Sequence, residues 1–439
     1  MFEKFDAIVV GGGISGLIAT QILSQAGYRV LLAEKEANLG GTNGSFRNAR
    51  GDTFDFGYHT IDYNRSPFTT RYFARMLKGK FHLLSLRRGI ALQGHTLPYN
   101  APVSEWPKDI ADKISASEFH DTLNGPPTRD AIEKIYGPFL TRVAFDEILP
   151  SYPSLAWQKK KGKPESDLMD SVYPWFFPQT SPKVVDGPEW VKFHQKVRNQ
   201  GEHQVMYPDE GGFGAFIGGI YDHIDHSHVT VVKGFASIDI VIDKKDQRVS
   251  NVVIDGTSYS ASLYFWCAPL VIMGRLLGMQ FPVAHPQMLC LGSFAFENEL
   301  PFRFHEILVG EKDVPINRIS FPGAIAGKRN NLLQIEFAYP VGDLDIKEDT
   351  WRADCLRYVR DRGLIPADSE PVEYAYFGAV KGFISSYDPR QMVADFQARL
   401  LSTTNVTYPY IGLEADNINR IVPSVFKQVY QAIADEAAV

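Results

Sequence analysis

Six residues near the start of the sequence, Gly11-Gly12-Gly13-Ile14-Ser15-Gly16, have the types and spacing of a diphosphate-binding turn. In a G-x-G-x-x-G arrangement the first glycine permits a tight turn and the second lets the backbone approach a pyrophosphate. The third lets a helix pack closely on a strand. Glu34 follows at the spacing where a carboxylate can hydrogen-bond a ribose hydroxyl. These residues predict dinucleotide binding, and the alternative is a glycine-rich structural turn.

The elements around this turn must place it at the end of a strand and the start of a helix. Residues 5–10 read as a buried strand, 14–26 as a helix with one apolar face, and 28–34 as a second strand. Such a β-α-β unit points the N-terminus of its helix at the ligand. The unpaired N–H groups and the dipole of that helix end favour an anion. The context therefore supports a Rossmann-type unit.

Several later segments carry further glycines and polar residues. Gly40-Gly41-Thr42 follows Glu34 closely, and Asp55, Gly57 and His59 come next. The other segments are Tyr207-Pro208 with Gly211-Gly212, residues 229–238, Trp266-Cys267-Ala268-Pro269, and Tyr410 to Gly412 with Asp416-Asn417. Together they resemble the FAD superfamily that contains amine oxidases, protoporphyrinogen oxidase, phytoene desaturases and UDP-galactopyranose mutase. The tail departs from the superfamily's usual Gly-Asp-Ala-like pattern, at Glu414 and Asp416.

The motif and the resemblance together imply FAD as the cofactor. They imply a Gly-Gly turn against the pyrophosphate and flavin, a chain that passes the flavin ring near Tyr58 and His59, and an adenine-side strand whose contact is the Ser237 backbone. The implied cofactor residues are Gly11, Gly13, Ile14, Ser15, Gly16, Glu34, Lys35, Gly41, Thr42, Tyr58, His59, Ser237, Gly412 and Asn417.

Candidate catalytic residues come from the same resemblance. His59 stands where the superfamily's chain runs beside the flavin, and a structural histidine is the alternative. Residues 94–100, Asn317-Arg318-Ile319 and 333–340 are similar to segments of the mutase. Arg318 could bind a substrate phosphate through a bidentate fork, as could Arg65, or form a surface salt bridge. Tyr339 and Tyr408 could contact substrate, and packing in the core is the alternative.

No metal site and no hydrolase site are predicted. His223, His226 and His228 form a tempting cluster, but they have no companion cysteine and fall at a helix-to-strand turn. A solvated histidine-rich turn is therefore expected. Cys267, Cys290 and Cys355 are widely spaced and form no disulfide framework, which fits a reducing compartment. No Ser/His/Asp or Cys/His arrangement has recognisable spacing.

The composition argues against some classes of binding partner. The net charge of −6 over 439 residues gives no reason to expect nucleic-acid binding. The most apolar stretch, 262–273, is too short to span a bilayer. With no leader pattern at the start, a cytoplasmic location is expected. The expected partner is a small-molecule substrate, a nucleotide sugar if the mutase hypothesis holds, and a homo-oligomer stays open.

The predicted fold class is α/β: a Rossmann-type FAD-binding domain of the glutathione-reductase-like kind, with an inserted α+β substrate domain. The FAD-binding domain is expected to be discontinuous, formed by residues 1–85, 205–275 and 395–439. The substrate domain is expected from residues 86–204 and 276–394. Strands predicted at 229–233, 238–243, 249–254 and 262–267 are expected to form antiparallel hairpins.

Three functions remain open at this point. The first is an FAD-dependent oxidoreductase of the amine oxidase/protoporphyrinogen oxidase-like class, which transfers a hydride between a small organic substrate and the flavin. The second is a nucleotide-sugar mutase like UDP-galactopyranose mutase, an isomerase that uses reduced FAD as a nucleophile. The third is a flavoprotein without catalysis. Base rates within the superfamily favour the first, and fold analogy alone does not decide the chemistry.

Overall fold

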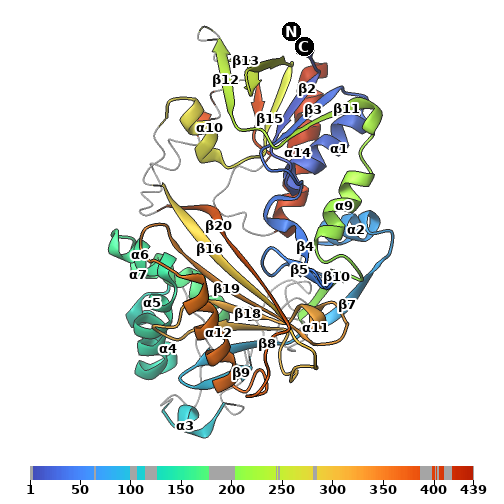
Figure 1. Ribbon diagram of the computed structural model, residues 1–439. Helices are drawn as coiled ribbons and strands as arrows, with labels where there is room; N and C mark the ends of the chain where they lie inside the picture. Colours follow the sequence, from blue (N-terminus) through green and yellow to red (C-terminus); the bar gives the residue numbers. More distant parts are fainter. Residues whose placement is uncertain are drawn as a thin grey trace.

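The computed structural model describes residues 3–63, 66–98, 106–113, 126–176, 203–243, 245, 248–279, 284–385, 398–400, 402, 405–409 and 418–438. Two main sheets organise this part of the chain (Figure 1). A parallel sheet with helices on one side lies at the top of the view, and a larger mixed sheet lies below it. The predicted α/β class with a Rossmann-type domain is confirmed.

The parallel sheet has the strand order β11-β3-β2-β15-β21. Its strands are β2 (Ala7–Val10), β3 (Val30–Glu34), β11 (Val229–Lys233), β15 (Leu263–Trp266) and β21 (Val406–Thr407). Helix α1 (Ile14–Gln25) makes the crossover from β2 to β3, as the glycine motif predicts. Both strands are completely buried, which is why they read as continuous apolar runs rather than as alternating ones.

Each face of this sheet packs against a different layer. Alternate residues of β2, Ala7 and Val9, face a core shared with the helices, whereas Ile8 and Val10 face the opposite core. The helices of the first layer are α1, α2 (Pro67–Met76), α9 (Gly214–Asp222) and α14 (Ile418–Ala437). The second layer holds α10 (Leu270–Leu276) and a four-stranded sheet of order β1-β14-β13-β12.

The four-stranded sheet corrects one prediction. Strands β12 (Ile238–Asp243), β13 (Arg248–Ile254) and β14 (Thr257–Ser260) are antiparallel neighbours, and β1 (Glu3–Lys4) pairs with β14 in parallel. Strands β11 and β15, however, are not hairpin partners of β12 and β13. They pair in parallel with β3 and β2, respectively. Turn residues mark where a strand ends, but they do not say which sheet receives the next strand.

The mixed sheet has the order β20-β16-β19-β18-β17-β8-β9. Its strands are β8 (Arg88–Leu92), β9 (His95–Pro98), β16 (Ala284–Ala295), β17 (Glu306–Val309), β18 (Arg318–Ser320), β19 (Leu332–Pro340) and β20 (Glu373–Ser385). Helix α12 (Glu348–Asp361) covers one face through Trp351 and Cys355. All seven strands fall in the segments predicted for the substrate domain, while the predicted domain boundaries themselves stay a prediction.

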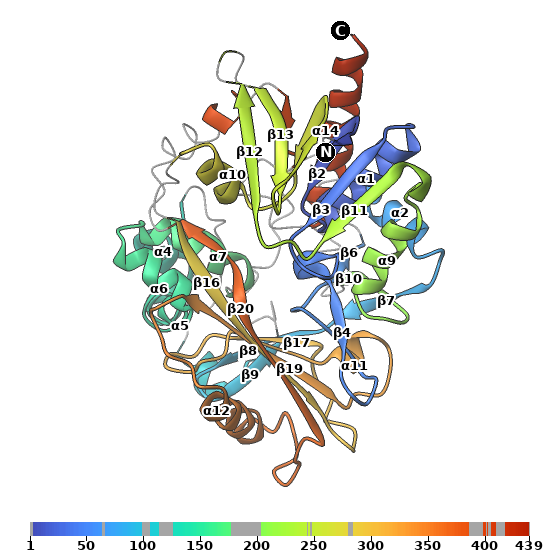
Figure 2. The ribbon, with the colours of Figure 1, turned by 45° about the horizontal axis from the view of Figure 1, so that its top comes forward.

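A helical group lies beside this sheet (Figure 2). It comprises α4 (Arg129–Arg142), the π-helical turn η3 (Val143–Ile148), α5 (Leu149–Ser151), α6 (Pro153–Lys160) and α7 (Glu165–Phe176). Its core includes Ile90 and Leu92 of β8. A short helix, α3 (Lys108–Ala111), lies between β9 and α4 in the chain.

Smaller elements connect the two main sheets. They are the hairpin of β4 (Ser45–Arg47) and β5 (Thr53–Asp55), the sheet of β6 (Ile61–Asp62), β10 (His203–Pro208) and β7 (Phe81–Leu86), and helix α11 (Pro322–Ile325). His82 on β7 contacts the Asp209 carboxylate at 3.1 Å and the carbonyl of Ile325 in α11 at 2.8 Å. These elements fix one sheet relative to the other.

Substitution of Gly16 by Val is expected to unfold the parallel-sheet region. A Cβ atom on Gly16 would lie 1.7 Å from the Gly11 carbonyl oxygen, a backbone atom that no rotamer change can move away. We expect a loss of more than about 4 kcal/mol in the free energy of unfolding, measured by denaturant titration.

The matched control is Gly218→Ala at an exposed position of α9, where the described residues leave open space around a Cβ atom. We expect this variant to be as stable as the parent or more stable by up to about 1 kcal/mol. Equal stability of the Gly16→Val variant and the parent would contradict the close helix–strand approach.

Candidate functional site

The glycine turn between β2 and α1 has the tight turn at Gly11 and the close helix–strand approach at Gly16 that its spacing predicts. Gly11 has φ +103°, and its N–H donates to the Ala33 carbonyl at 2.7 Å. A Cβ atom there would meet the Cys267–Ala268 backbone at 2.8 Å, so the end of β15 also requires this glycine. Gly16 allows the helix to touch Gly11. The first intrahelical bond described runs from Leu17 N to Gly13 O at 2.9 Å.

Gly13 differs from its neighbours because its α-carbon faces open space. In the part of the chain that the structure describes, no atom lies within 4 Å of a Cβ built on Gly13. Ile14 and Ser15, like the other residues of the first helical turn, have no intrahelical acceptor for their N–H groups. The first turn of α1 carries no acidic residue, so its dipole is uncompensated. This backbone can hold an anion.

The second glycine turn lies directly against the first. Gly40, with φ +114°, donates its N–H to the Gly12 carbonyl at 2.8 Å, and Gly13 bridges to Gly40. Gly41 and Thr42 follow in the 3₁₀ turn η1 (Gly41–Asn43). A Cβ atom on Gly41 would lie 3.7 Å from the Gly13 α-carbon. The sequence predicted both turns as cofactor contacts, and the structure brings them together.

Glu34 lies at the end of β3 beside the first turn. Its Oε2 accepts the Gly12 N–H at 2.6 Å, and its Oε1 accepts the Glu36 N–H at 2.8 Å. The side chain is buried, whereas that of Lys35 is exposed. A carboxylate has about four lone-pair sites, so two backbone contacts leave acceptor capacity for a ribose hydroxyl.

Asp55 holds the hairpin β4–β5 to the loop before α9. Its buried carboxylate accepts bonds from Ser45 Oγ at 2.6 Å, the Tyr207 hydroxyl at 2.7 Å and Phe213 N–H at 2.8 Å. Burial raises the pKa of Asp55 above its usual value, although these hydrogen bonds act in the opposite direction. A Cβ atom on Gly212 would lie 2.5 Å from this carboxylate, which explains the glycine pair there.

His59 follows four residues later and is half-buried. Its Nε2 lies 2.7 Å from the Thr42 carbonyl oxygen. Because a carbonyl only accepts, Nε2 carries the proton and donates it. The ring also packs on Phe213, with the ring centroids 5.5 Å apart. The structure thus places His59 against the Gly40–Thr42 turn, and its predicted position beside a flavin stays a prediction.

Tyr58 and Arg318 meet at the boundary between the two main sheets. The Arg318 guanidinium lies 5.5 Å above the Tyr58 ring. The Tyr58 N–H donates to Glu336 Oε1 at 2.8 Å. Burial raises the pKa of the Tyr58 hydroxyl well above its usual value. Tyr58 therefore reaches the mixed sheet through both its ring and its backbone.

Arg318 lies between two buried carboxylates. Its Nε is 3.6 Å from Glu306 Oε1, and its Nη1 is 3.8 Å from Glu336 Oε2. Arg88 binds the other oxygen of Glu306 at 3.1 Å. The charges of the two arginines and the two glutamates cancel. The salt-bridge alternative is thus the arrangement observed, although these carboxylates are buried and not on the surface.

The structure does not bring Tyr339 and Tyr408 to this network. Side chains alternate along β19, so Tyr339 faces the α12 core with Phe337, on the side opposite Glu336. Burial raises the pKa of Tyr339 to about 12. Tyr408 is buried beside the parallel sheet, in the core that also holds Trp266. For both residues the packing alternative describes the position observed.

The backbone of Ser237, the predicted adenine-side contact, pairs with Asp255. The backbone N–H of Ser237 donates to Asp255 Oδ1 at 2.8 Å, and its carbonyl accepts the Asp255 N–H at 3.1 Å. The adenine contact predicted there stays a prediction. Arg65, Gly412 and Asn417 lie outside the described residues.

Sequence reasoning assigned no role to Glu306, Glu336 and Arg88. Isolated charged residues in short strands carry no periodic signal, because only the strand order shows that they are neighbours. Glu306 pairs in register with Arg88, and Arg318 with Glu336. These pairs of opposite charges could have indicated the network, but they can be recognised only when the strand register is known.

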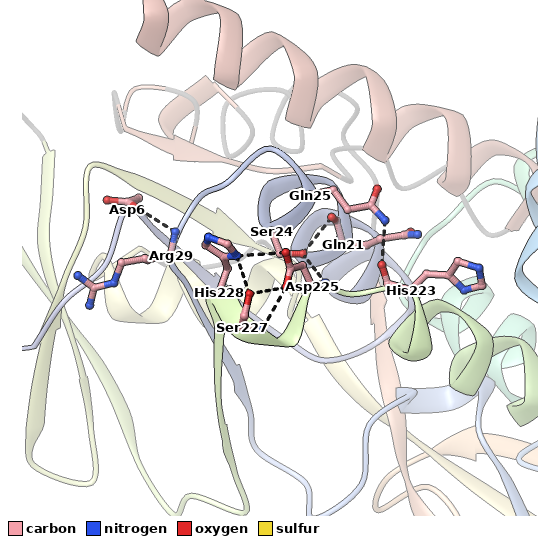
Figure 3. Close-up of polar contacts among 9 residues, drawn as sticks. All are labelled: Asp6, Gln21, Ser24, Gln25, Arg29, His223, Asp225, Ser227 and His228. Atoms are coloured by element: carbon pink, nitrogen blue, oxygen red, sulfur yellow. Dashed lines mark hydrogen bonds and ion pairs between the residues drawn. The ribbon is translucent and has the colours of Figure 1, made fainter.

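The histidine-rich turn after α9 does not form a common centre (Figure 3). Asp225 accepts the Ser227 hydroxyl at 2.6 Å and contacts His228 Nδ1 at 3.2 Å. His223 contacts the Gly219 carbonyl at 2.7 Å and points away from Asp225. Over the described ranges, no three His, Cys, Asp or Glu side chains are placed to hold a metal ion.

Comparisons with known proteins agree with this geometry. A model described as an NAD(P)-binding Rossmann-like domain matches residues 9–76. All-trans-retinol 13,14-reductase of Rattus norvegicus is 44% identical over 70 residues, which are 16% of this chain and 11% of that protein. Flavin-containing amine oxidase B of Bos taurus is 39% identical over 57 residues, 13% and 11% of the two chains. The chain thus spans about a tenth of the length of these relatives.

Solved structures extend the likeness to the whole chain. Reduced UDP-galactopyranose mutase superposes with a TM-score of 0.69 at 16% identity, over 99% of this chain and 96% of that one. A cofactor-binding variant of putrescine oxidase gives 0.60 at 13% identity, over 99% and 100%. The predicted resemblance to the amine oxidase-like superfamily is therefore confirmed. The named relatives are enzymes, and the identity to the solved structures is low enough that they show the fold alone.

None of the helices within the described residues combines the length and apolar character needed to cross a membrane. The cytoplasmic location and the homo-oligomer stay predictions.

His305, next to Glu306, is expected to make stability depend on pH. Burial, followed by the charge of Arg87, lowers the pKa of His305 from its usual value near 6.5 to about 4. Its Nδ1 accepts the Arg87 N–H at 2.9 Å, a bond that requires this nitrogen to be unprotonated. As the pH falls, the unfolded state takes up this proton first. The stabilisation is therefore present above pH 6.5 and is lost between about pH 6.5 and 4.

Replacing His305 by Asn should reduce the loss of unfolding free energy between pH 6.5 and 4 by about 1–3 kcal/mol. The measurement is the free energy of unfolding, by urea titration, at half-unit steps from pH 7.5 to 4. The exposed His226→Asn variant serves as the control and should run parallel to the parent. A parallel profile for His305→Asn as well would refute the buried neutral imidazole.

Proposed function

We propose that this protein is an FAD-dependent oxidoreductase of the amine oxidase/protoporphyrinogen oxidase-like class, acting on a small organic substrate by hydride transfer with the flavin. The observation that carries the proposal is the open backbone at Gly13. It lies between an uncompensated helix N-terminus, the second glycine turn and the Glu34 carboxylate.

The residues present fit FAD. The diphosphate would lie against Gly13 and the first N–H groups of α1, and Glu34 would accept a ribose hydroxyl. Gly41 lies next to Gly13, and Thr42 follows it and contacts His59 through its carbonyl. The side of Gly13 is the one place in the turn where the described chain does not itself fill the space, in contrast to Gly11, Gly12 and Gly16.

When bound, FAD would supply the hydride acceptor or donor, which amino-acid side chains cannot provide. The residues of the chain orient and enclose it. His59 is held by the Thr42 carbonyl and the Phe213 ring. Phe56 packs on Phe46 and on Phe377 of β20, with centroid separations of 5.3 and 5.1 Å. These aromatic contacts join the hairpin β4–β5 to the mixed sheet.

A nucleotide-sugar mutase remains the second candidate, because reduced UDP-galactopyranose mutase superposes over nearly the whole chain. That chemistry requires cations for a diphosphate. Arg318 is the predicted cation, yet two buried carboxylates balance it. A diphosphate next to Arg318 would add negative charge beside Glu306 and Glu336, and this repulsion favours the oxidoreductase.

Substitution of Gly13 by Val should abolish FAD retention without unfolding the protein. The backbone of Gly13, with φ −74°, suits any residue, and its surroundings in the described chain are open. The valine side chain would occupy the space proposed for the diphosphate. We expect a melting temperature within about 2 °C of the parent when both proteins are measured free of flavin, because a bound ligand would itself stabilise the parent. We also expect less than a tenth of the flavin per chain, measured by visible absorbance after denaturation.

Gly218→Ala is again the matched control and should retain parental flavin content. A yellow Gly13→Val protein with full flavin content would contradict the placement of FAD. A parent protein that is colourless and does not take up added FAD would refute the cofactor assignment itself.

The choice between the two chemistries follows from anaerobic spectra. Oxidised protein mixed with a panel of amines should lose its absorbance near 450 nm with at least one of them, since a hydride donor reduces the flavin. Reduced protein mixed with UDP-galactopyranose should leave the sugar unchanged. Ring contraction of the sugar with no net change in flavin oxidation state would instead establish the mutase.

A further inference from the structure

A short segment beside the proposed flavin site is held from the opposite domain. Asp55, Phe56, Gly57 and Tyr58 run from the hairpin β4–β5 to His59. The Gln334 amide donates to the Asp55 carbonyl at 2.9 Å, and the Glu336 carboxylate accepts the Tyr58 N–H at 2.8 Å. Both side chains come from β19 of the mixed sheet. Side chains two residues apart share one face of a strand, so β19 binds this segment at two points.

Glycine at position 57 makes the second contact accessible. Its φ of +100° turns the chain so that a Cβ atom would lie 3.7 Å from the Glu336 carboxylate. No larger residue adopts this backbone without strain. The turn presents the Tyr58 N–H to Glu336 and sends the next residue, His59, toward the Thr42 carbonyl.

Glu336 is buried and charged, and such a group persists only if other groups compensate it. Arg318 lies 3.8 Å away on the neighbouring strand. Glu336 also makes the single described hydrogen bond of the Tyr58 N–H. An apolar residue would fill the same space without burying a charge, so packing alone does not account for a carboxylate here.

We propose that Glu336 is a positioning residue: by accepting the Tyr58 N–H across the domain boundary, it fixes the Gly57–His59 segment and hence the His59 ring. Arg318 then serves to compensate Glu336, and not to bind substrate phosphate. The proximity of this segment to a flavin rests on the proposed function. The immobilisation of the segment by Glu336 is independent of that function.

The first test measures the segment itself, without any flavin. Amide hydrogen exchange of the peptide containing Tyr58 is followed by mass spectrometry in the protein as purified and after removal of bound cofactor. In Glu336→Ala we expect exchange of this peptide to accelerate at least about tenfold, because a hydrogen bond to a charged group is lost. Glu336→Gln keeps an amide oxygen as acceptor and should recover most of the protection.

Glu306→Gln is the matched control. It removes the other carboxylate next to Arg318 but does not accept the Tyr58 N–H, which bonds to Glu336, so the Tyr58 peptide should exchange as in the parent. If Glu336→Ala does not fold, Glu336→Leu combined with Arg318→Met removes both charges and still leaves the Tyr58 N–H without its acceptor. This pair should show the same acceleration.

The second test measures the affinity of the protein for FAD. In Glu336→Ala the dissociation constant of FAD, measured by flavin fluorescence, should rise at least about fivefold, with recovery in Glu336→Gln. Unchanged exchange at Tyr58 in Glu336→Ala, or equal acceleration in Glu306→Gln, would overturn the positioning role. A parent that binds no FAD would refute the proposed function instead, while the exchange experiment would still decide the role of Glu336.

Discussion

The close approach of backbone to backbone at the end of β2 is the constraint on which the rest of the structure depends. A Cβ atom on Gly16 would lie 1.7 Å from the Gly11 carbonyl, and one on Gly11 would lie 2.8 Å from the backbone after β15. Helix α1 and strands β2 and β15 can meet only where side chains are missing. The same absence of side chains leaves the Gly13 backbone uncovered, so tight packing and an accessible anion site have one cause.

From this point outward, buried carboxylates connect the elements. Glu34 accepts the Gly12 N–H, Asp55 accepts the Phe213 N–H, and Glu336 accepts the Tyr58 N–H, at distances of 2.6 to 2.8 Å. Each of these bonds joins segments that are distant in sequence. A carboxylate offers several acceptor sites in fixed directions, and charged acceptors give stronger bonds than neutral ones. The chain thus uses acids to hold irregular backbone where no sheet or helix satisfies it.

The nucleotide-binding unit could be predicted from the sequence because its information is local. Three glycines, a helix and a terminal acid lie within 34 residues, and each has a separate steric or electrostatic reason. The Gly40–Thr42 turn and His59 followed from resemblance, and the structure brings them to the same place. The hairpin prediction was wrong for β11 and β15, because period and turn signals define strands but not their partners.

The residues of the mixed sheet could be predicted less well, because their positions depend on strand order and register, which the sequence does not show. Tyr339 and Glu336 are three residues apart, and an odd spacing on a strand places them on opposite faces. The sequence alone does not say which face is the core. The structure does: Leu333, Ile335, Phe337 and Tyr339 pack under α12, so Gln334 and Glu336 lie on the opposite face, where they bond to the backbone of Asp55 and Tyr58. Gln334 and Glu336, to which sequence reasoning assigned no role, are therefore the β19 residues that contact the segment next to the proposed flavin site.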